Sequence, residues 1–159
     1  MIFVTVGTQL PFDRMVSVVD KWAGKHSETE ILVQSGKSEQ EFLNCVVLEE
    51  ILPVEWDDFF QQADFIVAHA GMGTILKSLD YNKPLVIMPR KAGLGEHRND
   101  HQLATANKFR HFENIQVVES EEELWQALEN PPSSCSDAMG TNENLERLIS
   151  EIRTFIQKE

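Results

Sequence analysis

One stretch of the sequence constrains the fold more than any other, because it joins a buried strand, a glycine-rich turn and a helix. The apolar run 65–68 leads into the turn 69–74, His-Ala-Gly-Met-Gly-Thr, and apolar residues then recur at helical spacing from Ile75. Two glycines allow a ligand to approach the backbone closely, and a helix N-terminus offers free N–H groups and the positive end of its dipole. The stretch therefore predicts an anion site that suits a phosphate.

A second apolar segment follows and leads into a polar loop. Residues 84–89, Pro-Leu-Val-Ile-Met-Pro, predict a strand whose limits are marked by the two prolines. The loop after it is rich in side chains that can hydrogen-bond to sugar hydroxyls: Arg90, Glu96, His97, Arg98, Asn99, Asp100, His101 and Gln102. In open α/β sheets, ligands bind at the carboxyl ends of the strands. We therefore expect the glycine turn and the polar loop to meet at one edge of a sheet.

Strands alternate with helices along most of the chain. Apolar segments predict strands at 2–6, 30–34, 42–48, 65–68, 84–89 and 115–119, with helical periodicity between most of them. Strand 2–6 also ends in a glycine turn, Gly7-Thr8-Gln9, and Ser120 with Glu123 forms a capping box that opens a helix. The pattern predicts an α/β fold, a Rossmann-like and mainly parallel sheet of about six strands with helices on both faces.

The 159 residues suffice for one domain with a substantial core. We expect the Rossmann-like domain at 1–129, a Pro- and Ser-rich linker at 130–140, and an amphipathic helix at 141–159 that packs on the domain or on a partner. A short helix after Pro53 carries Trp56, Phe59 and Phe60. Their aromatic rings suit the core better than a partner surface, although both remain open.

Charge and cysteine content narrow the classes of partner and compartment. A formal charge of -12 disfavours nucleic acid and bare anionic membranes as partners. The two cysteines, Cys45 and Cys135, lie far apart without metal-ligand spacing, which indicates a reducing compartment. The sequence begins with a strand rather than an export signal, and no apolar run reaches membrane-spanning length. We expect a cytoplasmic protein whose contact with any membrane is indirect.

Four segments together carry a resemblance to a known family. Val-Gly-Thr-Gln at 6–9, the turn 69–74, Lys-Pro-Leu-Val-Ile-Met-Pro at 83–89 and Asp-His-Gln-Leu-Ala at 100–104 resemble, in order and spacing, the C-terminal, donor-binding domain of family 28 glycosyltransferases. That family includes the transferase that adds N-acetylglucosamine in peptidoglycan precursor synthesis. The resemblance spans roughly 1–129. It implies one half of a GT-B fold, in which the reaction takes place between two Rossmann-like domains.

More narrowly, the chain resembles free-standing half-enzymes of this family. These are the soluble subunit of the dolichol-pathway UDP-N-acetylglucosamine transferase and the small subunits of bacterial exopolysaccharide and capsule glycosyltransferases. The loop 95–102 most closely resembles that of the bacterial subunits. The resemblance implies a membrane-attached partner subunit that binds the lipid-linked acceptor. We expect the chain to be inactive alone and, with the surface for that partner exposed, to self-associate in isolation.

The resemblance also implies roles for residues of the glycine turns. Gly7, Thr8, Gly71, Gly73 and Thr74 match positions that bind the diphosphate of a UDP-sugar, although Gly7 and Thr8 could also form a simple strand-to-helix turn. His69 matches a histidine of sister families and either hydrogen-bonds a phosphate or braces the loop.

In the polar loop, His101 and Gln102 match the pair that contacts sugar hydroxyls. Glu96, His97 and Asp100 join them as candidates for sugar or nucleotide binding, with loop organisation or an ordinary solvated loop as the competing interpretations. One position departs from the family: relatives often carry an acidic residue for the ribose where this chain has Lys77.

The expected chemistry is inverting transfer of a hexose from a UDP-sugar, in polysaccharide biosynthesis. Charge that develops on the leaving diphosphate would be stabilised by the helix N-terminus, so we expect neither a metal nor a cofactor. The general base is expected on the partner, and no catalytic residue is assigned here. Two alternatives remain: a non-catalytic accessory protein that enhances a partner transferase, and an unrelated nucleotide binder, which the lack of a compact G-x-G-x-x-G motif disfavours.

Overall fold

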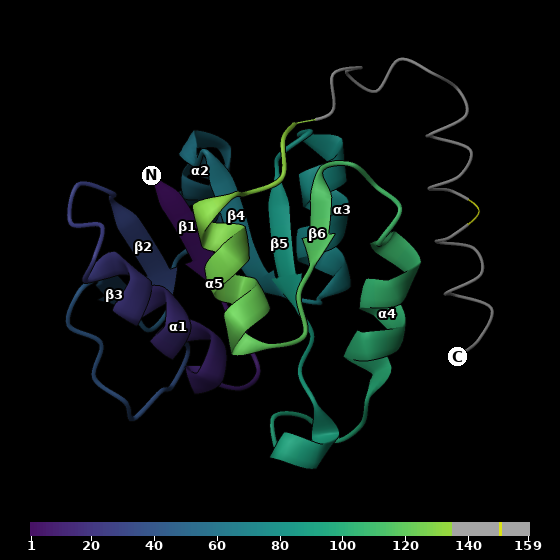
Figure 1. Ribbon diagram of the computed structural model, residues 1–159, viewed down its shortest axis with the longest axis horizontal. Coiled ribbons are helices and arrows are strands. Elements are labelled where there is room, and N and C mark those ends of the chain that lie inside the picture. The colour runs from purple at the N-terminus through teal and green to yellow at the C-terminus, as the bar shows by residue number, and fades with distance from the viewer. Residues whose placement is uncertain (135–149, 151–159) are drawn as a thin grey trace.

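Six short apolar segments form one parallel sheet in the computed structural model, which describes residues 1–134 and residue 150 (Figure 1). The strands are β1 (Ile2–Thr5), β2 (Ile31–Gln34), β3 (Val46–Leu48), β4 (Phe65–His69), β5 (Leu85–Met88) and β6 (Ile115–Val117), in the spatial order β3-β2-β1-β4-β5-β6. Val4 in β1 pairs with Val33 on one side and with Val67 on the other. The strand order reverses between β1 and β4, which is where open α/β sheets place their ligands.

Helices cover both faces of the sheet (Figure 1). They are α1 (Asp13–Ala23), α2 (Pro53–Gln62), α3 (Met72–Asp80), α4 (His101–Phe109) and α5 (Glu121–Glu129), with a 3-10 turn, η1 (Ala92–Leu94), after β5. Because side chains alternate across a strand, β1 supplies both sides of the core. Val4 packs with α1 and α5, whereas Phe3 packs with α2, α3 and α4.

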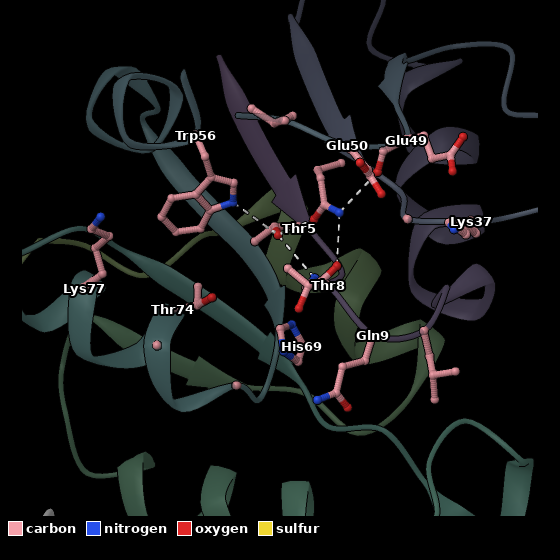
Figure 2. A pocket seen from close by; sticks show the side chains of 17 residues that line it. Thr5, Thr8, Gln9, Lys37, Glu49, Glu50, Trp56, His69, Thr74 and Lys77 are labelled. Atoms are coloured by element: carbon pink, nitrogen blue, oxygen red, sulfur yellow. Dashed lines mark hydrogen bonds between the residues drawn. The ribbon is translucent and has the colours of Figure 1, made fainter. Parts of the chain in front are cut away.

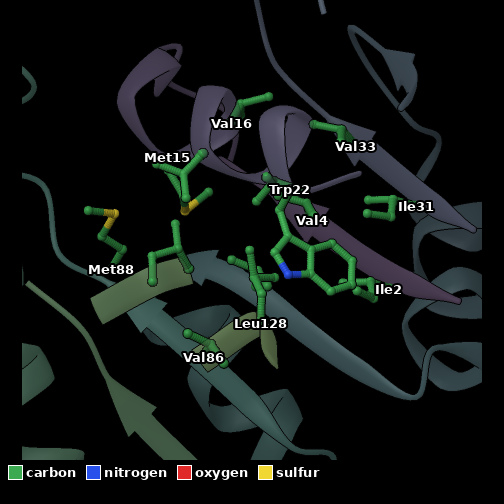
Figure 3. Packing of buried hydrophobic residues seen from close by; sticks show 14 of the residues in the cluster. Ile2, Val4, Met15, Val16, Trp22, Ile31, Val33, Val86, Met88 and Leu128 are labelled. Atoms are coloured by element: carbon green, nitrogen blue, oxygen red, sulfur yellow. The ribbon is translucent and has the colours of Figure 1, made fainter. Parts of the chain in front are cut away.

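The core on the α1 and α5 side is built from closely packed aliphatic side chains (Figure 3). Met15 and Trp22 of α1 meet Leu124 and Leu128 of α5 above the central strands, and all four are nearly inaccessible to solvent. Both helices are therefore fixed on the sheet by burial of apolar surface, the main source of stability in such a domain. This core holds β1 and β4 in place, and the turns that follow these two strands form the candidate site.

The structure confirms the predicted fold class, with all strand pairs parallel. The third strand is shorter than the predicted range 42–48, because the chain before Val46 is held by α1 instead. The backbone N–H and side-chain amide of Asn44 donate to the Asp20 carboxylate at 2.7 and 3.1 Å. Cys45 is only half-buried beside this contact, and burial raises the pKa of its thiol to about 12.

The predicted capping box is present at the start of α5. Ser120 Oγ accepts a hydrogen bond from the Glu123 N–H at 3.1 Å, while the Glu123 carboxylate accepts from the N–H of Glu119, one residue before the cap. Of the predicted linker, residues 131–134 have neither helical nor strand structure. Residues 135–140 and the predicted helix 141–159, apart from residue 150, lie outside the described residues. Within the described part of the chain, no helix is both long and apolar enough to cross a membrane.

Candidate functional site

A pocket of about 850 Å³ opens at the carboxyl ends of β1, β2 and β4 (Figure 2). Its lining comes from the ends of these strands and the turns after them, from the segment before α2, from the first turn of α2 and from the first two turns of α3. The residues are Thr5, Gly7, Thr8, Gln9, Leu10, Gln34, Gly36, Lys37, Glu49, Glu50, Ile51, Trp56, His69, Gly71, Gly73, Thr74 and Lys77. All residues predicted from the two glycine turns to bind diphosphate are therefore gathered in one cavity.

The N-terminus of α3 forms one side of the pocket. Gly71 is the N-cap residue, and the first helical hydrogen bond runs from the Ile75 N–H to the Gly71 carbonyl at 3.1 Å. The N–H groups of Met72, Gly73 and Thr74 thus precede the helical hydrogen-bond ladder, and no side chain of the described residues caps the helix. Gly73 and Thr74 line the pocket, so these amides and the helix dipole favour an anion there.

The imidazole of His69 is wedged between the two glycine turns. A β-carbon added at Gly7 would lie 2.6 Å from His69 Cε1, and one added at Gly71 would lie 2.3 Å from His69 Nε2. Gly7 also has a φ of +80°, a conformation that favours glycine. The two glycines are therefore required to make room for the histidine ring, a role that the sequence did not indicate.

His69 is uncharged in this environment at neutral pH. Burial, together with the nearby Arg90 guanidinium, lowers the pKa of His69 to about 4. Among residues 1–134 and 150, no hydrogen-bond partner is found for its buried Nδ1 atom. A neutral imidazole at the pocket wall can donate one hydrogen bond to a phosphate oxygen without adding a positive charge. The geometry fits both predicted roles of His69, the brace and the phosphate contact.

A polar network with buried side chains forms the floor of the pocket (Figure 2). Thr5 Oγ1 donates to Gln34 Oε1 at 2.7 Å, and Gln34 Nε2 donates to the Gly7 carbonyl at 3.0 Å. The Gly7 N–H points back to Thr5 Oγ1 at 3.3 Å, and the Trp56 indole N–H approaches the same oxygen at 3.5 Å. Because the Gly7 N–H is engaged within this network, a ligand would meet the first turn mainly through Thr8. The predicted diphosphate contact of Gly7 itself stays a prediction.

Trp56 and Lys77 line the side of the pocket between α2 and α3. The Lys77 ammonium forms an ion pair with Asp57 and lies 5.2 Å from the centre of the Trp56 ring. Trp56 itself stacks on the fully buried Phe60 at 4.9 Å. The aromatics of α2 therefore belong to the core, with Trp56 also offering part of its surface to the pocket. Lys77 reaches the pocket where relatives often carry the ribose-binding acid.

The predicted residues of the polar loop lie outside the pocket lining. Glu96 accepts hydrogen bonds from Arg14 Nε at 2.5 Å and from the Lys91 N–H at 2.9 Å. Burial alone would raise the pKa of Glu96, but these hydrogen bonds outweigh it and lower the pKa. Glu96 thereby ties the loop to α1. Its predicted contact with a nucleotide or sugar stays a prediction.

The other loop candidates also serve the loop or the turn beside it. Gln102 Oε1 accepts from the N–H groups of Ala70 at 3.3 Å and Arg90 at 3.1 Å, so it joins the glycine turn to the end of β5. Asp100 accepts from the Ala92 N–H at 2.9 Å. His101 is exposed, and His97 has a buried Nδ1 without a partner among the described residues. Contacts of these four residues with a sugar or nucleotide remain predictions.

Arg90 differs most from its predicted place in a hydrophilic loop. Its side chain is buried, with 2% of the residue exposed, and its guanidinium donates to backbone carbonyls of the segment that follows β1. Metal coordination has no candidate in the described part of the chain, since no group of three or more His, Cys, Asp or Glu side chains is arranged for it there. The expectation that the reaction needs no metal stays a prediction.

Several lining residues were not singled out as site residues from the sequence: Thr5, Gln34, Lys37, Glu49, Glu50, Ile51 and Trp56. Thr5 and Gln34 carried a usable signal, because each is a polar residue at the carboxyl end of an otherwise apolar strand. The others stand in segments whose position depends on packing between distant parts of the chain.

Comparison with known proteins agrees with this geometry. The family model for the glycosyltransferase family 28 C-terminal domain matches residues 1–153. The NDP-glycosyltransferase YjiC of Bacillus subtilis is 24% identical over 113 residues, which cover 64% of this chain and 27% of YjiC. The chain thus spans about a quarter of the length of this curated relative.

Solved structures share the fold. ALG13, determined by NMR, has 21% identity and a TM-score of 0.63, with 92% of this chain and 93% of that chain covered. The glycotransferase of kitacinnamycin has 17% identity and a TM-score of 0.64, with 94% of this chain and 37% of that chain covered. The arrangement of both glycine turns around one pocket and the family match over nearly the whole sequence lead to one conclusion: the chain belongs to the glycosyltransferase family 28 C-terminal domains.

Proposed function

We propose that this chain is the donor-binding subunit of a two-component inverting glycosyltransferase, which transfers a hexose from a UDP-sugar to a lipid-linked acceptor in polysaccharide biosynthesis. One observation carries the proposal: the uncapped N-terminus of α3 opens into a pocket of about 850 Å³ that also contains Thr8 and neutral His69. A nucleoside diphosphate matches these groups, since it brings a compact anion to the amides and a large polar body to the remaining cavity.

Within this proposal, the diphosphate lies against the amides of Gly73 and Thr74, with the Thr74 hydroxyl and Thr8 as further donors. Lys77, Trp56 and the Glu49–Glu50 segment then surround the nucleoside. The hexose extends toward His101 and Gln102 at the start of α4. The buried network of Thr5 and Gln34 keeps the floor of the pocket rigid, so the donors need no rearrangement when the ligand binds.

The reaction follows from this placement. An acceptor hydroxyl forms a bond to the anomeric carbon as the bond from that carbon to the diphosphate oxygen breaks, and UDP leaves with the electron pair. Negative charge on the diphosphate increases in the transition state, so the amides at the start of α3 stabilise the transition state more than the bound donor. The proposal includes no metal and no cofactor. The acceptor proton passes to a base on the partner subunit.

The proposal includes a membrane-attached partner that completes the cleft and holds the acceptor, with this chain at the cytoplasmic face of the membrane. The fold of ALG13 supports it, because this chain covers 93% of that solved chain, which therefore holds about one such domain. Exposed aliphatic side chains offer surface for a partner or for a second copy: Leu43, Val46, Leu48, Leu52 and Val54 are 39% to 84% exposed.

Calorimetric titration with UDP, UDP-N-acetylglucosamine, UDP-glucose and UDP-glucuronate tests the proposal. We expect UDP to bind, Gly73→Ala to weaken binding by placing a methyl group in the pocket, and His101→Ala to weaken only the sugar-bearing ligands. Trp125→Ala is the control: Trp125 packs on the α1 and α5 side of the sheet, opposite to α3, and its loss should leave the affinity for UDP unchanged. Absence of binding at millimolar UDP, both alone and with the cognate membrane subunit, would rule out a donor site.

The accessory role remains the second candidate, and the exposed aliphatic residues around β3 and before α2 favour it. An accessory protein would raise the activity of its partner without binding a nucleotide. An activity assay of the complex separates the two functions, because substituting Gly73 should abolish activity only if this chain binds the donor.

A further inference from the structure

The buried guanidinium of Arg90 connects the segment that contains the first glycine turn with the loop that follows β5. Its Nη2 donates to the carbonyls of Val6 at 2.9 Å and Leu10 at 2.5 Å. Its Nη1 donates to the carbonyls of Pro11 at 2.7 Å and Glu96 at 3.4 Å. Three of these acceptors belong to the segment after β1, and the fourth belongs to the loop after β5. One side chain therefore fixes the relative position of both segments.

The two carbonyls held by Nη2 bracket the part of the turn that faces the pocket. Gly7, Thr8 and Gln9 lie between Val6 and Leu10, and all three line the cavity. From the other side, Gln34 holds the Gly7 carbonyl. The turn is thus anchored at both ends by Arg90 and at its first residue by the floor network, which leaves the Thr8 hydroxyl and amide at a defined place in the pocket.

Burying this charge is costly, and the surroundings show what offsets the cost. The guanidinium centre lies 4.6 Å from the centre of the Phe12 ring, and its hydrogen-bonded partners are backbone carbonyls. The neighbouring carboxylate of Glu96 pairs with Arg14 instead. Burial lowers the pKa of Arg90 to about 10, so it stays charged at neutral pH. A charge held in this way requires nearly all of its donors to be satisfied, which fixes the positions of the carbonyls around it.

We propose that Arg90 is a positioning residue for donor binding: without touching the ligand, it sets the place of Thr8 in the pocket and links that turn to the loop containing Glu96. The proposal rests on the proposed function. A lysine cannot replace the arginine fully. The two terminal nitrogens of the planar guanidinium each reach two carbonyls, and a single ammonium group cannot span both pairs.

The test compares Arg90→Met and Arg90→Lys with two controls. Arg110→Met removes an arginine that forms a surface ion pair with Glu119. The side chains of Arg110 and Glu119 are 46% and 41% exposed. Leu128→Ala removes buried side-chain volume from α5, on the α1 side of the sheet. UDP affinity is measured by calorimetry, unfolding by urea, and the position of the turn by the carbonyl carbon shifts of Val6 and Leu10 and the amide shift of Thr8.

We expect Arg90→Met to weaken UDP binding by about 10- to 100-fold, the loss in affinity that follows when a hydrogen bond to a charged group is displaced. Arg90→Lys should weaken it less and move the same three shifts in the same direction. Both controls should bind UDP as the wild type does, although Leu128→Ala will be less stable. If Arg90→Met fails to fold, Arg90→Lys carries the test.

Two results would overturn the positioning role. One is a folded Arg90 variant with unchanged UDP affinity; the other is an equal loss of affinity in Leu128→Ala, which would make the effect one of general stability. Failure of the proposed function is distinguishable, because the wild type itself would then not bind UDP. In that case the chemical shifts of Val6, Leu10 and Thr8 still test whether Arg90 positions the turn, since unchanged shifts in Arg90→Lys would exclude that role.

Discussion

The imidazole of His69 occupies the space that a β-carbon at Gly71 would need, with Nε2 only 2.3 Å from that position. For Gly73, two residues later, no described residue outside its own helix turn has an atom within 4 Å of the equivalent position. The two glycines of the motif therefore serve different purposes. Gly71 accommodates a side chain of the protein, whereas Gly73 leaves room in the pocket.

Gly71→Ala should lower the free energy of unfolding by about 1–3 kcal/mol, the usual cost of overpacking. Gly73→Ala should leave it unchanged or raise it slightly, because alanine is the better helix former. Urea unfolding measures both. Because the cost at Gly71 comes from the ring, it should largely disappear in a His69→Ala background. An equal cost in both backgrounds would show that the clash with His69 is not its cause.

The pKa of His69 predicts how stability depends on pH. Its ordinary value is 6.5, and burial lowers it to about 4 in the folded chain. Between these values the unfolded chain binds more protons, so the free energy of unfolding should fall as the pH decreases from 6.5 toward 4, by at most about 1.4 kcal/mol per pH unit. Well above pH 6.5 the residue is neutral in both states, and its contribution to the pH dependence vanishes.

Urea unfolding of the wild type and of His69→Gln at several pH values measures this contribution. The variant should gain stability relative to the wild type as the pH falls. His111→Gln, which replaces an exposed histidine, is the matched control and should show no comparable gain. A constant difference between the wild type and His69→Gln across the range would contradict the low pKa.

Glu96 and Arg14 should act as a coupled pair that organises the loop. Their side chains are 12% and 15% exposed and are joined by two hydrogen bonds at 2.5 and 2.9 Å, so solvent screens the pair less than a surface ion pair. A double-mutant cycle with Glu96→Gln and Arg14→Met should give a coupling energy of about 1–3 kcal/mol.

The same variants address the predicted sugar contact of Glu96. If Glu96 only organises the loop, Glu96→Gln should weaken UDP and UDP-sugars by the same factor, as calorimetry would show. A loss confined to the sugar-bearing ligands, and absent in Arg14→Met, would instead indicate direct contact with the hexose.

Ser120→Ala should remove the cap of α5 and lower the free energy of unfolding by about 1 kcal/mol. The hydroxyl accepts the Glu123 N–H at 3.1 Å, and the helix packs on α1, away from the pocket. UDP affinity should therefore be unchanged. A loss of affinity in this variant would mean that the pocket is sensitive to stability in general.

Much of the fold could be predicted because it rests on local patterns. Apolar runs ending in glycine, and helical spacing between them, are repeated along the chain and specify a parallel sheet. The two glycine turns also predicted the position of the pocket, because each follows a strand and these two strands are neighbours in the sheet. The third strand was less predictable, because whether residues 42–45 pair with β2 depends on a contact between Asn44 and Asp20 across 24 residues.

The role of Arg90 could not be predicted for a physical reason. Arginine after a strand usually faces water, and nothing in its sequence neighbourhood marks it as buried. Three of its four acceptors are backbone carbonyls about 80 residues earlier in the chain. The sequence gives no sign of such contacts, because every residue has a backbone carbonyl. Contacts of this kind become visible only once the strands are brought together.

Among the described residues, those that line the pocket all precede Asp80, whereas the sugar-binding residues predicted from the polar loop follow β5. If the proposed function holds, recognition of the nucleotide and recognition of the hexose depend on consecutive halves of the chain, with a junction in the short connection between α3 and β5. Recombination between relatives at that junction would exchange one specificity while keeping the other, provided that Arg90 is retained to join the halves. Under the proposed function, a chimera made there should bind a different donor sugar.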